Sequence, residues 1–395
     1  MGCKQARRRM RLRGVWAALF CLVFAALSHP SSLTPDSKSS PAWAEAAPGY
    51  QFSFPRDHAA HTDSRIEWWY YTGNLATKSG RRFGYQLTFF RIGVVREQVN
   101  SSRWALRDLY MAHFAISDVE KQSFRSFERI NRAGIGWAGA DDRDSPGADK
   151  SLKPAVRVWN EDWDTRIENG SHTIRASEEG ASLVLKLVPS KPEVVHGENG
   201  ISQKGPTEGN ASHYYSLTRL ESSGLIDVEG QSFEVSGLSW MDHEFGTSFL
   251  DDQQTGWDWF SIHLEDGRDL MLFEIRRRDG SIDTRSSGTL IDAGGKAIHL
   301  NFEDFSLKPG RLWRSAKSGA DYPTEWQIQL PGYGLLLNVT AEIEDQELRT
   351  PDSTGVSYWE GSVAIQGAAG ATAIRGSGYL EMTGYSGPNM SEVLR

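Results

Sequence analysis

Cysteine is almost absent from this chain of 395 residues, which contains only Cys3 and Cys21. Both lie in an N-terminal segment where several arginines precede an uninterrupted apolar stretch over residues 15–27. A basic region followed by a short apolar core is typical of a secretory signal peptide. Removal of this segment would leave a chain without thiols. The sequence therefore predicts a mature protein without disulfides or thiolate metal sites.

Long hydrophobic runs are absent as well. The apolar stretch over 15–27 is shorter than the roughly 20 residues that a membrane-spanning helix needs. Small residues follow it, so we expect a signal peptide over 1–28, with cleavage as late as residue 44. A Ser-, Pro- and Ala-rich flexible leader over 29–49 comes next. These features predict an exported protein, periplasmic or secreted, that is not an integral membrane protein after cleavage.

Basic residues are fewer than acidic ones. The chain carries 43 Lys and Arg against 51 Asp and Glu, a formal net charge of −8 at pH 7. Loss of the arginine-rich N-terminal segment would make the mature protein more negative still. A negative protein repels polyanions, and we therefore predict no nucleic-acid partner and no attraction to anionic lipid.

Helical periodicity is rare, and strand alternation dominates. Phe83, Tyr85, Leu87 and Phe89 alternate with smaller or polar residues, as in a strand. The single helical candidate lies around 119–130, where apolar residues are three apart. Many short strands with glycine turns predict an all-β chain of antiparallel barrels or sandwiches, because closure hides sheet edges. Further alternating runs cover residues 183–188, 232–237, 256–264, 269–276, 325–330, 335–341 and 376–383.

A faint internal repeat predicts two such units. An aromatic strand at Trp68–Tyr71 leads through a glycine turn to a second strand that ends near Arg91. The same order recurs in the second half, from Trp257–Phe260 to Arg276. Strands that return after a tight turn are typical of hairpins. We expect an N-terminal domain over 50–248 and a C-terminal domain over 249–395.

Fourteen tryptophans are more than cores of ordinary composition need. Barrels of about eight strands can enclose one small ligand. Aromatic walls suit an apolar or conjugated guest, and also the faces of sugar rings. We expect most tryptophans to fill the two cores. In and beside the two aromatic strands, the candidate ligand-binding residues are Glu67, Trp69, Tyr71, Trp257 and Trp259.

The densest polar cluster is Asp242-His243-Glu244, which follows a predicted strand. The two-residue period of a strand would place Asp242 and Glu244 on one face and His243 on the other. An acid that is buried among aromatic residues has a raised pKa and can act as a general acid near neutral pH. The alternative is a structural salt bridge with an arginine such as Arg65 or Arg91. Spacing alone leaves both interpretations open.

Several long motifs occur in the order found in one known family. These motifs are Glu67–Gly73, Phe83–Arg91, His213–Arg219, Gly237–Gly246, Gly256–Gly280, Ser357–Gly361 and Gly378–Tyr385. With them the chain resembles the AttH and carotenoid 1,2-hydratase (CrtC) family from about residue 50 to residue 387, and it is most similar to the AttH-like secreted branch. The resemblance implies two lipocalin-like antiparallel β-barrel or sandwich domains in tandem.

The resemblance also implies a chemistry. In the carotenoid hydratases an aspartate protonates a terminal isoprenoid double bond and water adds to the resulting cation, which requires an acid in a dry aromatic cavity. The family's His-x-Trp and Tyr-x-Asp pairs fall on His213-x-Tyr215 and Trp240-x-Asp242, with the two aromatic residues exchanged in type. Asp242 would be the proton donor, and His213 would position water or substrate. The aromatic rings around the developing cation would be Trp240, Tyr215 and Trp257. Further ligand contacts would come from His243 and Glu244.

Two classes of function stay open on these residues. In one, the exported protein binds a hydrophobic, isoprenoid or lipid-like molecule around Asp242 and serves an ABC-type exporter. In the other it is an enzyme, either a hydro-lyase that uses Asp242 or a secreted hydrolase, as the AttH-like branch is often described. We expect no cofactor in either case.

Three other sites are weakly indicated. Ser239 lies near Asp242 in sequence, but it is not on the strand-to-helix turn of a nucleophile elbow. A glycoside hydrolase would need Glu67 and Asp242 roughly 5 to 10 Å apart. Imidazole and carboxylate suit zinc, yet the spacing of the candidate ligands is poor and we predict no metal site. Those ligands are His58, His61 and Asp63.

Overall fold

The computed structural model describes residues 42–96, 102, 105–141, 155–387 and 390. The expected signal peptide and most of the expected leader lie outside these residues. The chain from Pro41 onward forms one compact unit. Within the described part, no helix has the length and apolarity that a membrane crossing requires.

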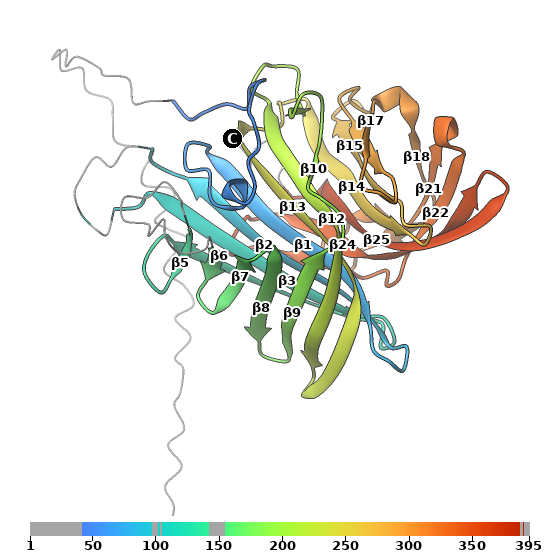
Figure 1. Ribbon diagram of the computed structural model, residues 1–395, viewed down its shortest axis with the longest axis horizontal. Helices are drawn as coiled ribbons and strands as arrows, with labels where there is room; N and C mark the ends of the chain where they lie inside the picture. The colour runs from blue at the N-terminus through green and yellow to red at the C-terminus, as the bar shows by residue number, and fades with distance from the viewer. Residues whose placement is uncertain (1–41, 97–101, 103–104, 142–154, 388–389, 391–395) are drawn as a thin grey trace, which may run out of the picture. The chain divides into compact units, whose positions relative to one another are not determined.

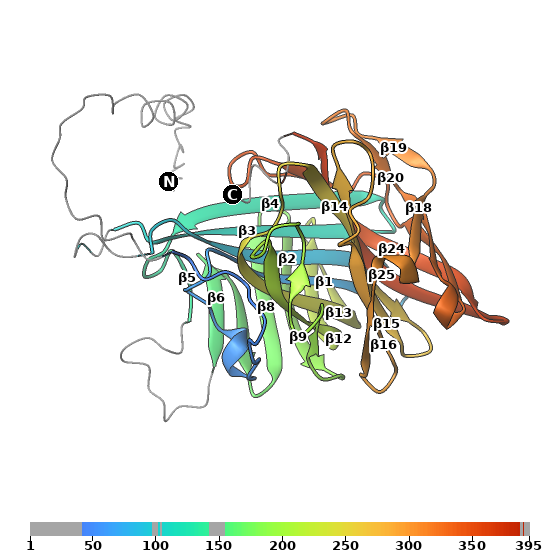
Figure 2. The ribbon, with the colours of Figure 1, turned by 90° about the horizontal axis from the view of Figure 1, so that it is seen from above.

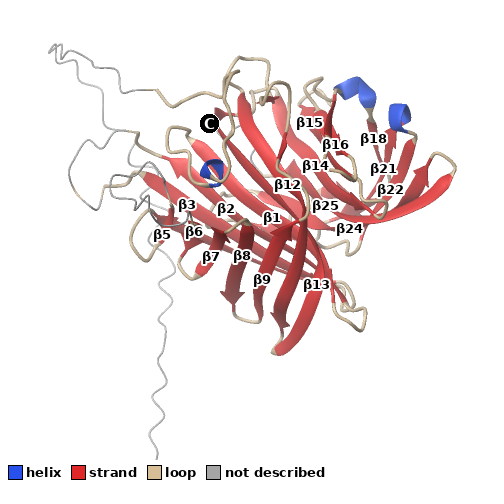
Figure 3. Cartoon of the chain, viewed as in Figure 1, coloured by secondary structure: helices blue, strands red, loops and turns tan. Residues whose placement is uncertain are grey.

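Strands make up nearly all of the regular structure, and the described helices are single 3-10 turns (Figure 3). These turns are η2 (Arg56–His58), η3 (Phe302–Asp304) and η4 (Pro331–Tyr333). All strand pairs in the sheets are antiparallel, as the alternation and glycine turns predict.

The first sheet has 13 strands, in the order β4-β3-β2-β1-β13-β12-β9-β8-β7-β6-β5, with β10 and β11 also paired to β12 (Figure 1). Its end strand β4 contacts β6, so that the sheet curls into a nearly closed barrel. The strands are β1 (Ile66–Ala76), β2 (Arg82–Gly93), β3 (Asp108–Asp118), β4 (Ser123–Arg132), β5 (Ala138–Ala140), β6 (Val156–Asn160), β7 (Trp163–Glu168), β8 (Ser171–Glu178), β9 (Ala181–Pro189), β10 (Val194–Val195), β11 (Ser202–Gln203), β12 (Ala211–Val228) and β13 (Gln231–Ser248).

The second sheet has 10 strands, in the order β17-β16-β15-β14-β25-β24-β22-β21-β18 with β23 on β24, and it forms a half-barrel. A separate two-stranded sheet pairs β19 with β20. The strands are β14 (Gln254–Leu264), β15 (Asp269–Arg277), β16 (Ser287–Ile291), β17 (Ala297–Leu300), β18 (Ser306–Pro309), β19 (Leu312–Arg314), β20 (Asp321–Pro323), β21 (Glu325–Leu330), β22 (Leu335–Ala341), β23 (Glu347–Arg349), β24 (Ser357–Ala369) and β25 (Thr372–Ser386).

The helical prediction for 119–130 is wrong, because residues 119–122 form a turn and the rest of the segment belongs to β4. In a strand, a spacing of three puts successive apolar residues on opposite faces. Phe127 packs against the core of the first barrel, whereas Phe124 packs against the cluster between the sheets. Ile130 is 40% exposed. The apolar side chains therefore lie on both faces of a strand and not on one face of a helix.

The two sheets pack face to face, with β1 against β25 and β2 against β24 (Figure 2). One hydrophobic cluster fills the interior of the first barrel and another fills the half-barrel. A third lies between the sheets and draws residues from both, such as Tyr70 and Trp259. Both faces of β1 are consequently buried, and its alternating side chains enter two different environments.

A glycine allows β1 and β13 to approach closely. A Cβ atom on Gly237 would lie 2.1 Å from the backbone oxygen of Asn74, so that a side chain here has to push the strands apart. We predict that Gly237→Ala lowers the free energy of unfolding by about 1–3 kcal/mol. The control is Gly332→Ala, where a Cβ atom meets nothing within 4 Å. Urea titration of both variants tests this, and equal stabilities would contradict it.

Candidate active site

A pocket opens between the two sheets. Its lining is mainly apolar and includes Trp68, Tyr70 and Tyr214 from the first sheet and Trp257, Trp259 and Phe273 from the second. The cavity has a volume of about 120 Å³. Small-molecule sites are typically concave and mainly apolar, with a few polar groups that orient the ligand. This pocket can therefore hold an apolar ligand.

Asp242 lines this pocket and is only 4% exposed. The Tyr214 hydroxyl donates a hydrogen bond to its Oδ2 at 2.7 Å, and Trp240 Nε1 donates to its Oδ1 at 2.6 Å. The Ser216 hydroxyl also donates to Oδ1. None of these donors is charged, and no arginine or lysine among the described residues pairs with Asp242. The salt-bridge alternative therefore does not apply to this carboxyl group.

Burial raises the pKa of Asp242 to about 7, against the opposing effect of its three hydrogen bonds. The nearby charge of Glu244 adds to the increase. Desolvation disfavours the charged form of a carboxyl group, and neutral donors compensate for it only in part. Near neutral pH a large fraction of Asp242 therefore carries a proton that it can donate into the pocket.

The register of β12 and β13 decides which neighbours reach Asp242. Ser216 lies opposite Asp242, and Tyr214 lies opposite Glu244. These even-numbered residues share the pocket face, so the prediction that Asp242 and Glu244 lie on one face is confirmed. Unlike Asp242, Glu244 has a cationic partner, because Lys204 Nζ lies 2.9 Å from its Oε1.

The structure does not bring His213 or Tyr215 to Asp242, contrary to the expected roles. Both are odd-numbered and face the opposite side of β12, since side chains alternate along a strand. Tyr215 Oη lies 3.0 Å from His243 Nδ1, and the His213 ring packs against Phe245. In the His-x-Tyr pattern, it is the middle residue, Tyr214, that contacts Asp242.

The remaining predicted ligand-binding residues divide in the same way. The pocket is lined by Trp257, Trp259 and Glu244. Trp240 is not part of the lining, but its indole donates a hydrogen bond to Asp242. The residues on the opposite face, away from this pocket, are Glu67, Trp69, Tyr71 and His243.

Sequence reasoning missed Trp68 and Tyr70, the neighbours of the predicted residues in β1. The pairing of Tyr70 with Asp242 across β1 and β13 would have identified them. It also missed Glu360 and Glu381, which line the pocket from β24 and β25.

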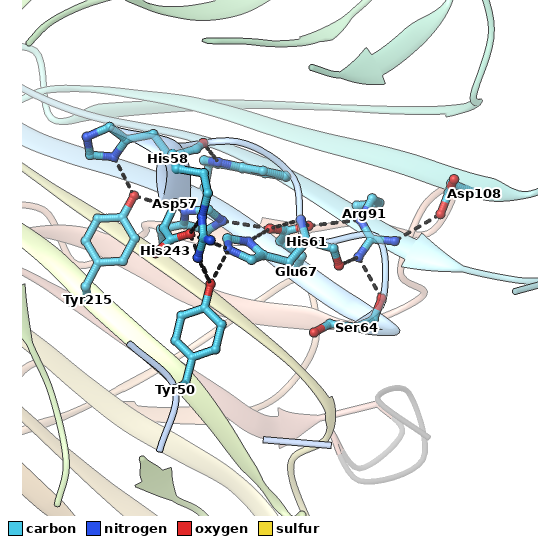
Figure 4. A network of polar contacts seen from close by, with 12 residues as sticks. Tyr50, Asp57, His58, His61, Ser64, Glu67, Arg91, Asp108, Tyr215 and His243 are labelled. Carbon is cyan, nitrogen blue, oxygen red and sulfur yellow. Dashed lines mark hydrogen bonds and ion pairs between the residues drawn. The ribbon is translucent and has the colours of Figure 1, made fainter. Parts of the chain in front are cut away.

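Glu67 belongs to a buried polar network in the first barrel (Figure 4). Arg91 Nε donates to its Oε2 at 2.9 Å, and His61 Nδ1 and His243 Nε2 lie 2.8 and 2.9 Å from its Oε1. Although burial opposes ionisation, the Arg91 charge and the two histidines hold the pKa of Glu67 well below its usual range. Glu67 is thus ionised and faces away from Asp242, so the two do not form a glycosidase pair.

Figure 4 also shows the closest approach to a metal site in the described residues. His61, Glu67 and His243 offer ligand atoms within 4.8 Å of one another. Two histidines and a glutamate can bind zinc. However, the guanidinium of Arg91 already neutralises Glu67, so we interpret the cluster as an ion-pair network.

The weakly indicated sites do not assemble. His58 Nδ1 lies 2.7 Å from Tyr215 Oη, and the exposed Asp63 pairs with Arg96 at 3.0 Å, so these residues do not converge with His61 on a metal. Ser239 accepts a hydrogen bond from the Tyr85 hydroxyl at 2.6 Å and lies 2.7 Å from the Ser222 hydroxyl. Without a histidine partner among the described residues, Ser239 lacks the base that a serine nucleophile requires.

A family model described as AttH-like matches residues 45–385. The chain belongs to the AttH-like family. A crystal structure from Nitrosomonas europaea, described as a candidate AttH, is 36% identical to this AttH-like chain, with a TM-score of 0.74 and coverage of 87% of this chain and 99% of that one. The similarity agrees with the lipocalin-like fold described above.

Two more distant proteins are also similar to this AttH-like chain. Kievitone hydratase from Nectria haematococca is 13% identical, covers 88% of this chain and 98% of its own, and has a TM-score of 0.65. The dehydratase asqC from Emericella nidulans is 22% identical over 229 residues, which are 55% of this chain and 63% of that protein. The match therefore spans less than two thirds of the dehydratase.

The Arg91 network offers a test of its structural role. Arg91 also pairs with Asp108 at 3.0 Å, and its side chain is fully buried. Arg91→Met would leave the buried Glu67 without its guanidinium partner and Asp108 with only Arg107 at 3.6 Å, so we predict a loss of about 3–5 kcal/mol in the free energy of unfolding. The control is Arg96→Met, which breaks an exposed pair and should cost about 1 kcal/mol or less. Chemical denaturation measures both, and a loss in Arg91→Met as small as the control's would contradict the structural role.

Proposed function

We propose that this AttH-like protein binds an apolar, unsaturated small molecule between its two sheets and adds water to it, or removes water, with Asp242 as the acid. The observation that carries this proposal is the carboxyl group of Asp242, which lines an apolar pocket without a cationic partner. A general acid works best when its pKa lies near the working pH. Asp242, with a pKa of about 7, meets this condition.

The pocket suits the proposed reaction. Proton transfer from Asp242 to one carbon of a double bond leaves a cation on the other carbon, and a water molecule then forms the new bond. Aromatic faces attract cations, and Tyr70 and Trp259 are among the rings that line the pocket. Apolar walls restrict the approach of bulk water, which strengthens the electrostatic effect of each polar group.

The comparisons support the same reaction class. Two of the similar proteins are named as a hydratase and a dehydratase, and addition and removal of water are opposite directions of one type of reaction. The chemistry in this chain would come from its own residues, with Asp242 as donor, Tyr214 and Trp240 as its supports, and the rings of the pocket around the substrate.

A second candidate is an exported binding protein without catalysis. The occupation of both Asp242 oxygens by Tyr214, Ser216 and Trp240 favours it, because these bonds also fit a structural carboxyl group. Export rests on the basic and apolar N-terminal segment, and an ABC-type exporter would be the partner of such a carrier. The ligand would again be hydrophobic, because the pocket lining is mainly apolar.

Replacement of Asp242 separates the two candidates. The purified protein is incubated with prenylated phenols and linear isoprenoid alkenes in heavy-oxygen water, and the products are analysed by mass spectrometry. We predict that the wild type incorporates the label and that Asp242→Asn loses ~100-fold or more in rate. The control Asp321→Asn changes an exposed aspartate in β20 and should keep the wild-type rate.

The pH dependence gives a further test of the same acid. Because the reactive form of Asp242 is protonated, kcat/KM for hydration should fall as the pH rises through about 7. A rate that is independent of pH across this range, or full activity in Asp242→Asn, would count against the hydro-lyase. Recovery of the same unchanged ligand from wild type and Asp242→Asn would support the carrier.

A further inference from the structure

A second pair of acids faces the pocket from the other sheet. Glu360 of β24 and Glu381 of β25 lie directly opposite each other in the strand register. Both line the same pocket as Asp242. Like charges at directly paired positions of a sheet are destabilising. None of the ion pairs among the described residues involves either glutamate, so the arrangement has no cation to offset this cost.

The local contacts leave this pair poorly satisfied. Trp257 Nε1 donates a hydrogen bond to Glu381 Oε1 at 2.9 Å. Glu360 is 1% exposed, and its Oε2 has no hydrogen-bond partner in the described part of the chain. The hydroxyl of Tyr379, a buried residue outside the lining, is also without one. Buried polar atoms normally have partners, so the unpaired oxygen of Glu360 at the pocket wall points to a group that is used by a ligand or by water.

Proton sharing explains how the pair is tolerated. Burial raises the pKa of both carboxyl groups, and the charge of Glu381 raises that of Glu360 further. Two carboxyl groups that share a low-dielectric site do not both ionise near neutral pH. The titratable groups that face the pair are Tyr70 of β1, Asp242 of β13, Tyr358 of β24 and Tyr379 of β25.

We propose that Glu360 and Glu381 are the proton acceptor of the pocket and work together with Asp242 as the donor. This inference rests on the proposed function and completes it. Asp242 comes from the first sheet and the pair comes from the second, so an acid and a base are available from different walls of one cavity. Residues that break local rules without a structural gain are expected at functional sites.

Asp242 and the two glutamates can donate and accept the protons that hydration requires. The π electrons of the double bond take the proton of Asp242 to form a C–H bond, and a lone pair of water forms a C–O bond with the cation. One proton of that water passes to the ionised carboxylate of the pair. Asp242 ends ionised and the pair ends with one more proton, and return of that proton through water restores the start. Dehydration runs through the same steps in reverse.

The charges of the pocket also define the substrate class. Four acids line it, namely Asp242, Glu244, Glu360 and Glu381, whereas its one lining lysine, Lys204, is paired with Glu244. No cation is left in the lining to bind an anionic group, and a buried carboxylate or phosphate would face repulsion. The substrate is therefore a neutral alkene or alcohol and not an anionic thioester or phosphate ester.

The protonation state can be measured without any substrate. Isotope-labelled glutamate carboxyl groups are followed by difference infrared spectroscopy in the wild type, Glu360→Gln and Glu381→Gln. We expect the wild type at neutral pH to show protonated carboxyl signals from the pair and from Glu274, whose pKa burial raises to about 8. The signal of the pair should disappear or titrate at lower pH in either variant, whereas that of Glu274 should stay. The control Glu303→Gln changes an exposed glutamate and should leave the signal unchanged. A wild-type spectrum in which no protonated glutamate signal depends on Glu360 or Glu381 would overturn the proposal.

Stability gives an independent measurement. The folded pair holds protons that the unfolded chain releases, so the pair makes the stability of the wild type fall as the pH rises above the usual glutamate range. Between about pH 5 and about pH 8, the melting temperature of Glu360→Gln should fall less than that of the wild type. An identical fall in both proteins would contradict a shared proton.

Kinetics then separates this inference from the proposed function. We expect Glu360→Gln and Glu381→Gln each to lose ~100-fold in turnover of the neutral alkene probes, with binding of a neutral fluorescent naphthylamine retained. Loss of turnover in Asp242→Asn with wild-type rates in both glutamate variants would overturn the inference alone. Wild-type rates in all three variants would overturn the proposed function as well.

Discussion

The packing of one sheet against the other is the constraint on which the rest of this structure depends. A strand of an isolated barrel buries only its inner face, but β1 and residues 239–246 of β13 are buried on both faces, by the interior of the first barrel and by the second sheet. Alternate side chains of these segments therefore enter two different buried environments. A shift of one residue in the register would exchange all of them.

The two environments treat carboxyl groups in opposite ways. Inside the first barrel, Glu67 has Arg91 and two histidines as partners, and it stays ionised although it is fully buried. Between the sheets, Asp242 has only neutral donors, and burial raises its pKa. The two acids come from neighbouring strands of one sheet, so their difference arises from the partners on each face and not from depth.

Catalysis of the proposed kind depends on both sheets. Asp242 and its hydrogen-bond donors belong mainly to the first sheet, whereas Trp257, Trp259 and the glutamate pair belong to the second. The Trp259 indole donates to the Tyr214 hydroxyl at 3.2 Å and so links the second sheet to the neighbour of Asp242. An acid supported from one sheet and a base from the other keep a fixed separation as long as the interface is intact.

The sequence by itself determined the all-β class and most strand positions, and it drew attention to Asp242, because alternation, glycine turns and unusual polar residues are local signals. Its prediction for 119–130 failed, since apolar residues three apart also fit a strand with apolar side chains on both faces. Only the tertiary structure decided that Tyr214 and not Tyr215 reaches Asp242, and that Glu360 and Glu381 share its pocket. These facts depend on strand register and on the packing of two distant sheets, which arise from contacts between residues far apart in the chain.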